Sequence, residues 1–216
     1  MLQNELLPEY LRLFHVEDAV PSCSVEARSV QEVLQAAAQG YDRDSIYYTI
    51  HRDEPVEQIL GKCRMLAQCM EDLVYVNELA AAHSELSGPE KVGLRMVPDG
   101  FDDEIRPGVR MDDLPDYARM VKKLEHLTVR GCFVNGCTDG IFGKALGKYF
   151  RACYVAAKQM TVVFPCAMPY LCAENALAAV VRNQKEQPET LQDCLTEASI
   201  VAMQNETAFY AKLFIK

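Results

Sequence analysis

The stretch KVGLRMV at positions 91–97 is apolar almost throughout, and only Lys91 and Arg95 interrupt it. A strand with one face in water alternates apolar and polar side chains, whereas a strand buried on both faces reads as a continuous apolar run. Runs of the same kind occur at 73–76 (LVYV) and 161–164 (TVVF). Such runs are typical of a parallel sheet whose two faces are both covered.

Helical patterns separate the strands that we expect along the chain. The expected strands lie at 23–27, 45–49, 73–76, 91–97, 128–134, 161–164, 199–203 and 209–215. The expected helices lie at 6–14, 29–40, 53–69, 77–85, 112–124, 141–159 and 174–183. This alternation predicts the α/β class, as either a doubly wound sheet or a (β/α) barrel. Because a complete eight-fold barrel typically takes about 250 residues, a barrel made by this chain would be incomplete.

The helix predicted over 29–40 has a signal at each end. Ser29-Val30-Gln31-Glu32 has the S-x-x-E form of a capping box, in which the serine oxygen accepts a hydrogen bond from the third amide of the helix. Gly40 supplies the residue with which helices commonly stop. The strand 23–27 therefore leads directly into a helix.

Composition bounds the class of protein. The chain has 216 residues, of which half are apolar and a quarter charged, and no linker or repeat divides it, so we expect a single domain over 1–216. Its formal charge of −9 argues against a nucleic-acid partner. A net negative charge is nevertheless compatible with a local basic patch on the surface. No apolar run approaches the roughly 18 residues of a membrane span, and residues 1–5 lack a signal-peptide pattern. We therefore expect a soluble, cytoplasmic protein.

Cysteine and histidine patterns give no metal site. The nine cysteines are odd in number and none has C-x-x-C spacing, so reduced, buried cysteines are expected in place of disulfides or zinc. The four histidines lack H-x-x-x-H or H-E-x-x-H spacing. The stretch 143–148 lacks the phosphate-loop pattern, and the acidic stretch 99–104 lacks the spacing of a calcium loop.

Several motifs occur in an order that points to a known family. The segment 27–32 (ARSVQE) looks like an A-S-x-x-E segment, and 92–98 (VGLRMVP) looks like a G-L-R-x-x-P strand. Pro107-Gly108-Val109 occupies the place of an F-G-[IV] loop. The strand and turn at 129–136 follow, and the tail from Glu197 is similar to an E-P-G-R-x-x-V segment. In this order the chain resembles the pyridoxal-phosphate (PLP) dependent barrel enzymes, which include alanine racemase and the diaminopimelate, ornithine and carboxynorspermidine decarboxylases.

The resemblance implies a fold and a set of site residues. The fold is an incomplete or degenerate TIM-like (β/α) barrel of the alanine racemase N-terminal type, and the cofactor is PLP. Arg95 would line the pocket, and Asn135 with Gly136 would stand where the family has a histidine over the cofactor ring. Glu197 would pair with the ring nitrogen. Other interpretations remain open: a structural ion pair for Arg95, a simple turn for Asn135-Gly136, and a surface carboxylate for Glu197.

Departures from the family pattern bear on the chemistry. The family's cofactor lysine lies on a first strand that precedes residue 1, and the first lysine of this chain is Lys62. The phosphate cradle is expected at 164–169, where Pro165 and Pro169 offer no amide to an anion, which argues against phosphate binding. The resemblance also stops short of the family's C-terminal β-domain. We therefore expect a domain that lacks the first strand and the β-domain.

Two functions follow, with no catalytic residue assigned in either. The first is a degenerate relative without Schiff-base catalysis, which acts as a binding or regulatory protein or is a relic; its ligand would be an amino acid or a phosphate compound. The alternative is a PLP-dependent decarboxylase or racemase completed by another chain or by an N-terminal segment. A homo-oligomer, such as a dimer, is expected because an open barrel would expose strand edges. An unrelated open α/β domain, such as a flavodoxin-like one, is a third interpretation.

Overall fold

A computed structural model gives the architecture of the chain. It describes residues 25–83, 86, 88–98, 100, 107–135, 141–164, 170–173, 179, 182, 185–187 and 212–215. Within these residues, strands and helices alternate, which confirms the α/β class.

The strands form one parallel sheet in which strand order follows chain order. The path runs β1-β2-β3-β4-β6-β7-β8, and β5 adds to the end of β4. A doubly wound sheet reverses its strand order at a switch point, whereas a barrel adds each new strand on the same side. The sheet is therefore a partial (β/α) barrel, open between β1 and β8 in the described part of the chain. The strands are β1 Val25–Ala27, β2 Ile46–Thr49, β3 Arg64–Ala67, β4 Glu90–Val97, β5 Val109–Arg110, β6 Leu127–Val134, β7 Tyr170–Ala173 and β8 Lys212–Ile215.

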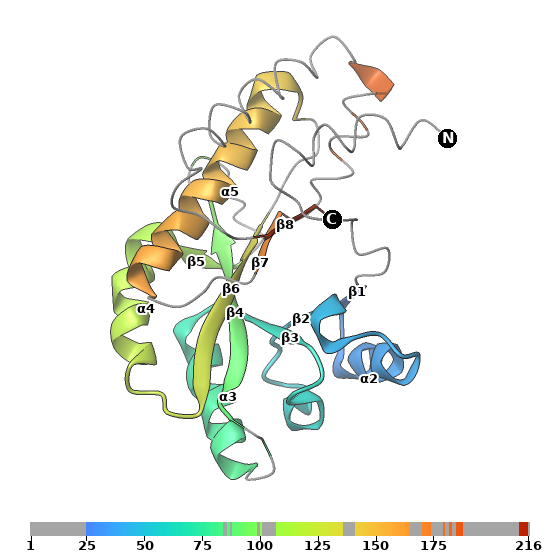
Figure 1. Ribbon diagram of the computed structural model, residues 1–216, viewed down its shortest axis with the longest axis vertical. Coiled ribbons are helices and arrows are strands. Elements are labelled where there is room, and N and C mark those ends of the chain that lie inside the picture. The colour runs from blue at the N-terminus through green and yellow to red at the C-terminus, as the bar shows by residue number, and fades with distance from the viewer. Residues whose placement is uncertain are drawn as a thin grey trace.

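Helices cover the outer side of this sheet (Figure 1). They are α2 Val30–Ala38, α3 Met70–Ala82, α4 Leu114–Val121 and α5 Gly143–Val163, with short 3-10 helices at Arg43–Ser45, Val56–Ile59 and Met111–Asp113. The predicted start and stop of α2 are confirmed: Ser29 Oγ accepts a hydrogen bond from the Glu32 amide at 3.2 Å, and Gly40 has φ 87°. None of the described helices is both long and apolar enough to cross a membrane.

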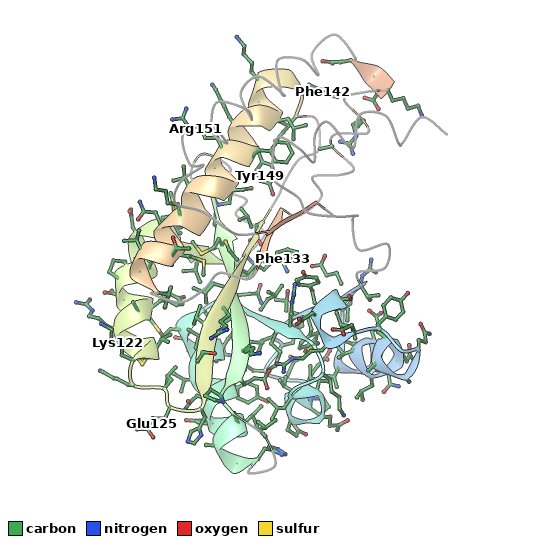
Figure 2. The ribbon with its side chains drawn as sticks, in the orientation of Figure 1. Lys122, Glu125, Phe133, Phe142, Tyr149 and Arg151 are labelled. Carbon is green, nitrogen blue, oxygen red and sulfur yellow. The ribbon has the colours of Figure 1, made fainter. Side chains whose placement is uncertain are left out.

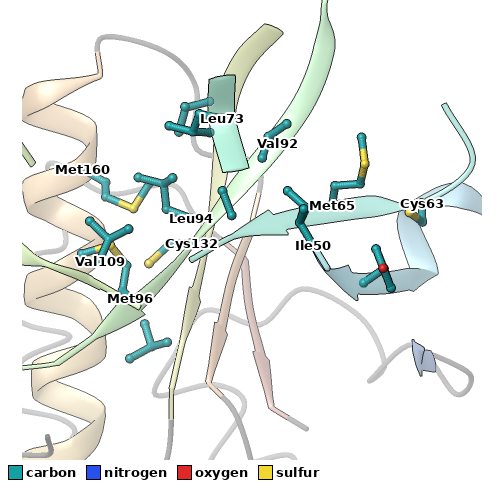
Figure 3. Packing of buried hydrophobic residues seen from close by; sticks show 14 of the residues in the cluster. Ile50, Cys63, Met65, Leu73, Val92, Leu94, Met96, Val109, Cys132 and Met160 are labelled. Carbon is teal, nitrogen blue, oxygen red and sulfur yellow. The ribbon is translucent and has the colours of Figure 1, made fainter. Parts of the chain in front are cut away.

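The main core lies between the strands and the helices. Leu94 and Met96 of β4 and Cys132 of β6 are fully buried there, and Met160 of α5 packs onto them (Figure 3). Cys63 and Cys153 are buried as well, and the cysteines at 63, 69, 132 and 153 are free thiols. Burial raises the pKa of Cys63 to about 12, so this thiol stays protonated and packs as a small apolar group.

A second, smaller cluster lies on the opposite face of the sheet. Tyr47, Leu66 and Phe133 are each at most 1% exposed and contact one another. Their chain neighbours, such as Tyr48 and Val134, belong to the outer core. Because successive side chains of a strand point to opposite faces, these three residues fill the inside of the partial barrel. We refer to them as the inner layer.

Three sequence-based assignments were wrong. The predicted helix 53–69 is a short 3-10 helix followed by β3, the predicted strand 73–76 lies within α3, and the predicted strand 161–164 lies in and just after the end of α5. In α3 the buried residues Leu73, Val76 and Ala80 recur at helical spacing, a period that a four-residue window does not resolve. β3 has only four residues and few strand formers, so only its pairing with β2 and β4 defines it.

The amino end of β4 carries a buried carboxylate. The Glu90 side chain is 2% exposed; it pairs with the Arg43 guanidinium and accepts a hydrogen bond from the Gly61 amide at 3.1 Å. Burial raises the pKa of Glu90 above its ordinary value of 4.5, although Arg43 and the Gly61 amide act in the opposite direction.

This burial predicts a pH effect on stability. The folded protein holds the Glu90 proton more tightly than the unfolded chain does. The contribution of Glu90 to the free energy of unfolding should therefore fall as pH rises from 4.5 through the raised pKa. Glu90→Gln removes that titration. Urea unfolding over this pH range should show the unaltered protein losing stability relative to the variant. Parallel pH profiles for the two proteins would contradict the prediction.

Candidate functional site

Polar side chains gather where several strands end at the carboxyl edge of the sheet. Thr49 is the last residue of β2, Asn135 follows β6 directly, and Arg95 lies near the end of β4. Glu26 of the short strand β1 joins them. In (β/α) barrels, ligands bind at this edge because the connecting loops surround it. We refer to Glu26, Thr49, Arg95 and Asn135 as the polar cluster.

Arg95 lies at the centre of the polar cluster and is 8% exposed. Its Nε donates to Asn135 Oδ1 at 2.6 Å, and its terminal nitrogen donates to Thr49 Oγ1 at 2.5 Å. The same nitrogen lies 3.3 Å from Glu26 Oε1, and the guanidinium carbon stands 4.7 Å from the centre of the Phe133 ring. A buried guanidinium is costly unless it is paired and hydrogen-bonded, and these contacts meet that need.

Asn135 is held by the backbone on two sides. Its amide donates to Met96 O at 2.8 Å, and its side-chain Nδ2 donates to Pro107 O at 3.2 Å. The side-chain amide thus faces Arg95 with its oxygen and the 107–108 loop with its nitrogen. The structure brings together two of the predicted site residues, Arg95 and Asn135. The other two, Gly136 and Glu197, lie outside the described residues.

Sequence analysis missed Glu26 and Thr49. A signal for both was present, because Ala27 and Tyr48 are apolar residues that belong to the outer core. Strict alternation along β1 and β2 then places Glu26 and Thr49 on the opposite face, inside the barrel. Each strand has at most four residues, so this pattern is short and overlaps with the capping signal at Ser29.

The inner layer closes the barrel beneath the polar cluster. Thr49 stands two residues beyond Tyr47 on β2, and Asn135 two residues beyond Phe133 on β6, so these two members of the polar cluster lie one layer nearer the carboxyl edge. Glu26 pairs in register with Tyr47, and Arg95 with Phe133. The Tyr47 and Phe133 rings have centroids 5.9 Å apart, and Phe133 lies among the central strands (Figure 2). Below them, Arg64 donates to the Tyr47 hydroxyl at 2.6 Å.

Comparison with known proteins finds matches in structure alone. No protein-family model matches the chain, and no curated protein matches it. Among solved structures, diaminopimelate decarboxylase from Helicobacter pylori in complex with L-lysine is 12% identical over 99% of this chain and 54% of its own, with a TM-score of 0.60. Arginine decarboxylase from Paramecium bursaria Chlorella virus is 13% identical over 99% of this chain and 60% of its own, with a TM-score of 0.58.

Ornithine decarboxylase from Entamoeba histolytica matches similarly, at 11% identity over 97% of this chain and 55% of its own, with a TM-score of 0.57. The chain has the fold of these decarboxylases. The predicted resemblance is thereby confirmed at the level of the fold, and the unrelated open α/β domain is excluded. The chain spans only a little over half the length of these decarboxylases.

The described residues of this decarboxylase fold do not fit a PLP group bound as a Schiff base. That bond needs a lysine at the site. Among the described residues, Lys62 lies in the loop before β3 and donates to Gln58 O at 2.8 Å, and Lys91 lies at the amino end of β4, far from the carboxyl edge. Lys212 begins β8, at the amino end of that strand. The remaining described lysines lie on or next to helices, at 122, 123, 144, 148, 158 and 185. No described group of histidine, cysteine, aspartate and glutamate could hold a metal ion.

The segment predicted as a phosphate cradle lies at a different place in the fold. Phe164 ends α5 and Tyr170 begins β7, so residues 164–169 come before this strand. A cradle at the ligand edge would follow the carboxyl end of β7, where the sequence continues with Glu174. The error arose because 161–164 was assigned to a strand, whereas 161–163 belong to the last turn of α5 and Phe164 follows it.

A cavity of about 610 Å³ lies beside the polar cluster. His51 and Arg52 line it after β2, and Gln68, Cys69 and Asp72 line it after β3. Pro107 lines it too, and its carbonyl accepts the hydrogen bond from Asn135. The cavity therefore adjoins the polar cluster across a single residue.

Asp72 organises the wall of this cavity. Its carboxylate accepts hydrogen bonds from the Gln68 amide at 2.9 Å and the Cys69 amide at 3.3 Å, and it lies 3.3 Å from Arg52 Nε. Burial, with a hydrogen bond to Glu71, raises the pKa of Cys69 to about 11. Because the thiolate is the nucleophile, Cys69 is a poor candidate for covalent chemistry near neutral pH.

Gly108 leaves no room for a side chain beside the polar cluster. A Cβ atom at this position would lie 2.9 Å from Arg95 O, 2.9 Å from Val97 Cγ2 and 3.1 Å from Asn135 Nδ2. The Arg95 backbone oxygen cannot move away without distorting β4. Gly108→Ala should therefore destabilise the fold by about 1–3 kcal/mol and weaken ligand binding at the polar cluster.

Urea unfolding and ligand titration measure both effects. The matched control is Gly88→Ala, because a Cβ there would meet nothing within 4 Å and should leave stability and binding close to those of the unaltered protein. Equal behaviour of the two variants would contradict the tight packing at Gly108.

Proposed function

We propose that this chain is a binding protein built on the decarboxylase barrel, which holds a small ligand through a carboxylate or phosphate group at the polar cluster. The observation that carries the proposal is the buried Arg95 guanidinium, which Thr49 and Asn135 orient at the carboxyl edge of the sheet. A cation in a site of low dielectric attracts an anionic group more strongly than the same cation in water. An amino acid carries such a carboxylate, and the adjoining cavity can take its side chain.

Titration calorimetry tests this proposal with propionate and inorganic phosphate as probes. At least one probe should bind to the unaltered protein and lose most of its affinity in Arg95→Gln. Gln keeps a polar side chain but removes the charge. Equal binding to both proteins would refute the proposal.

In this proposal no described lysine serves as a Schiff-base amine, because none belongs to the polar cluster. Addition of pyridoxal phosphate should give no aldimine absorbance band attached to a single lysine. Borohydride reduction followed by peptide mass spectrometry is the measurement. Specific labelling of one lysine would overturn this part of the proposal.

A second candidate function is a PLP-dependent decarboxylase or racemase completed by a further segment or another chain. The observation that favours it is the sheet, which is open between β1 and β8 in the described part of the chain. A strand that pairs with both would complete a barrel of the decarboxylase type. The borohydride experiment distinguishes the two functions when it is run on the protein together with the completing segment or chain, because the completed enzyme would label a lysine and the binding protein would not.

We further propose that the protein is a cytoplasmic homo-oligomer, since pairing between copies would cover the open edge of the sheet. Sedimentation velocity should show a dimer or larger species. A stable monomer at low micromolar concentration would refute the oligomer and leave the ligand site unaffected.

A further inference from the structure

Glu26 differs from the other members of the polar cluster in exposure and in contact distance. Its side chain is 36% exposed, whereas that of Arg95 is 9% exposed. The 3.3 Å contact between Arg95 and Glu26 is longer than the 2.5 Å and 2.6 Å contacts of Arg95 with Thr49 and Asn135. Among the described residues, none donates a hydrogen bond to Glu26 Oε2. Glu26 is therefore the loosely held partner of a firmly held cation.

The pair places opposite charges side by side at the mouth of the site. A simple carboxylate or phosphate that approaches Arg95 also meets the Glu26 carboxylate, and like charges repel at this range. An α-amino acid brings a carboxylate and an ammonium group on adjacent atoms. Its carboxylate can pair with Arg95 while its ammonium group pairs with Glu26, so the buried guanidinium and the Glu26 carboxylate each keep an ionic partner.

We infer that Glu26 selects α-amino acids over simple carboxylates and phosphates by binding the ligand's ammonium group. This inference rests on the proposed binding function of Arg95. It adds the residue that binds the second charged group of the ligand, its ammonium group.

The remaining contacts of Arg95 allow this exchange. When a ligand displaces Glu26, Thr49 Oγ1 and Asn135 Oδ1 still accept hydrogen bonds from Arg95, and the Phe133 ring still packs on the guanidinium. The guanidinium thus keeps its position while its charge partner changes. A site prepared in this way loses little ordering entropy on binding.

The carboxylate of Asp72 in the neighbouring cavity is less suited to this role. Asp72 in the neighbouring cavity accepts hydrogen bonds from two backbone amides and pairs with Arg52. Its charge is therefore already compensated by contacts that hold the start of α3. An ammonium group would have to displace Arg52 to reach it.

The test compares L-alanine with propionate, which has the same carboxylate but no ammonium group. The full chain is titrated with each probe by NMR or calorimetry, in the unaltered protein and in Glu26→Gln. The unaltered protein should prefer L-alanine. In Glu26→Gln the affinity for L-alanine should fall about tenfold, the scale of one hydrogen bond to a charged group, and that for propionate should rise.

Glu78→Gln is the matched control, because it removes the same charge from an exposed position on α3 and should change neither affinity. Equal binding of the two probes to the unaltered protein would overturn the inference and leave the proposed function standing. An equal effect of Glu26→Gln on both probes would do the same. Binding of neither probe, and of no inorganic phosphate, would overturn the proposed function itself.

Discussion

Arg95→Leu should abolish ligand binding at the polar cluster and destabilise the fold by about 3–5 kcal/mol, the scale of removing one partner from a buried ion pair. The replacement leaves the Asn135 oxygen without its donor inside the barrel, and it removes the partners of Thr49 and Glu26. Unsatisfied buried polar groups add to the loss of the charge. Urea unfolding and titration with L-alanine give the two measurements.

Two further variants separate charge from geometry. Arg95→Lys keeps the charge but cannot reach Asn135 and Thr49 with a planar fork, so it should retain part of the stability and little of the binding. Arg119→Leu is the control for loss of a surface arginine, because the Arg119 side chain is 76% exposed and pairs only weakly with Asp116 in water. A stability loss below about 1 kcal/mol for Arg95→Leu would show that the cluster is not a buried network.

Long strands and capped helices were predictable from the sequence. The apolar run at 91–97 is wholly within β4, and the run at 128–134 is within β6, because eight-residue strands carry enough pattern to exclude a helix. β3 was not predictable, since its four residues RMLA gain their conformation from pairing with two neighbours. Long-range pairing of this kind leaves no local signal.

Half of the polar cluster was predictable, and for different reasons. Arg95 is conspicuous because a charge interrupts an apolar strand, and Asn135 follows from the family pattern. Glu26 and Thr49 fall in β1 and β2, which have three and four residues. So few residues show the alternation of inward and outward side chains at most twice. Their role depends on the tilt of strands in a barrel, which brings residues of β1, β2 and β4 together, and no local pattern encodes that tilt.

The polar cluster and the fold together support the proposed binding role. A barrel concentrates the ends of its strands at one edge, so a few inward side chains suffice to make a site. In this chain those side chains are one arginine, one glutamate, one threonine and one asparagine, which provide charge and hydrogen bonds but no described nucleophile or amine. Recognition of a ligand needs only charge and hydrogen bonds.

Phe133→Ala should cost about 3–5 kcal/mol of stability and also weaken ligand binding. Phe133 is fully buried, packs on Tyr47 inside the barrel, and places its ring 4.7 Å from the guanidinium carbon of Arg95. Removal of the ring leaves a cavity directly below the polar cluster and takes away the face on which Arg95 rests. The Arg95 guanidinium can then move into this cavity, away from its position between Thr49 and Asn135.

Phe150→Ala is the matched control, because Phe150 of α5 is equally buried but packs in the outer core against Tyr149. Its loss should cost a similar free energy of unfolding and leave the affinity for L-alanine unchanged. Comparison of the two variants separates general destabilisation from support of the site. If both variants lowered affinity equally, Phe133 would act only through stability, and the inner layer would have no part in positioning Arg95.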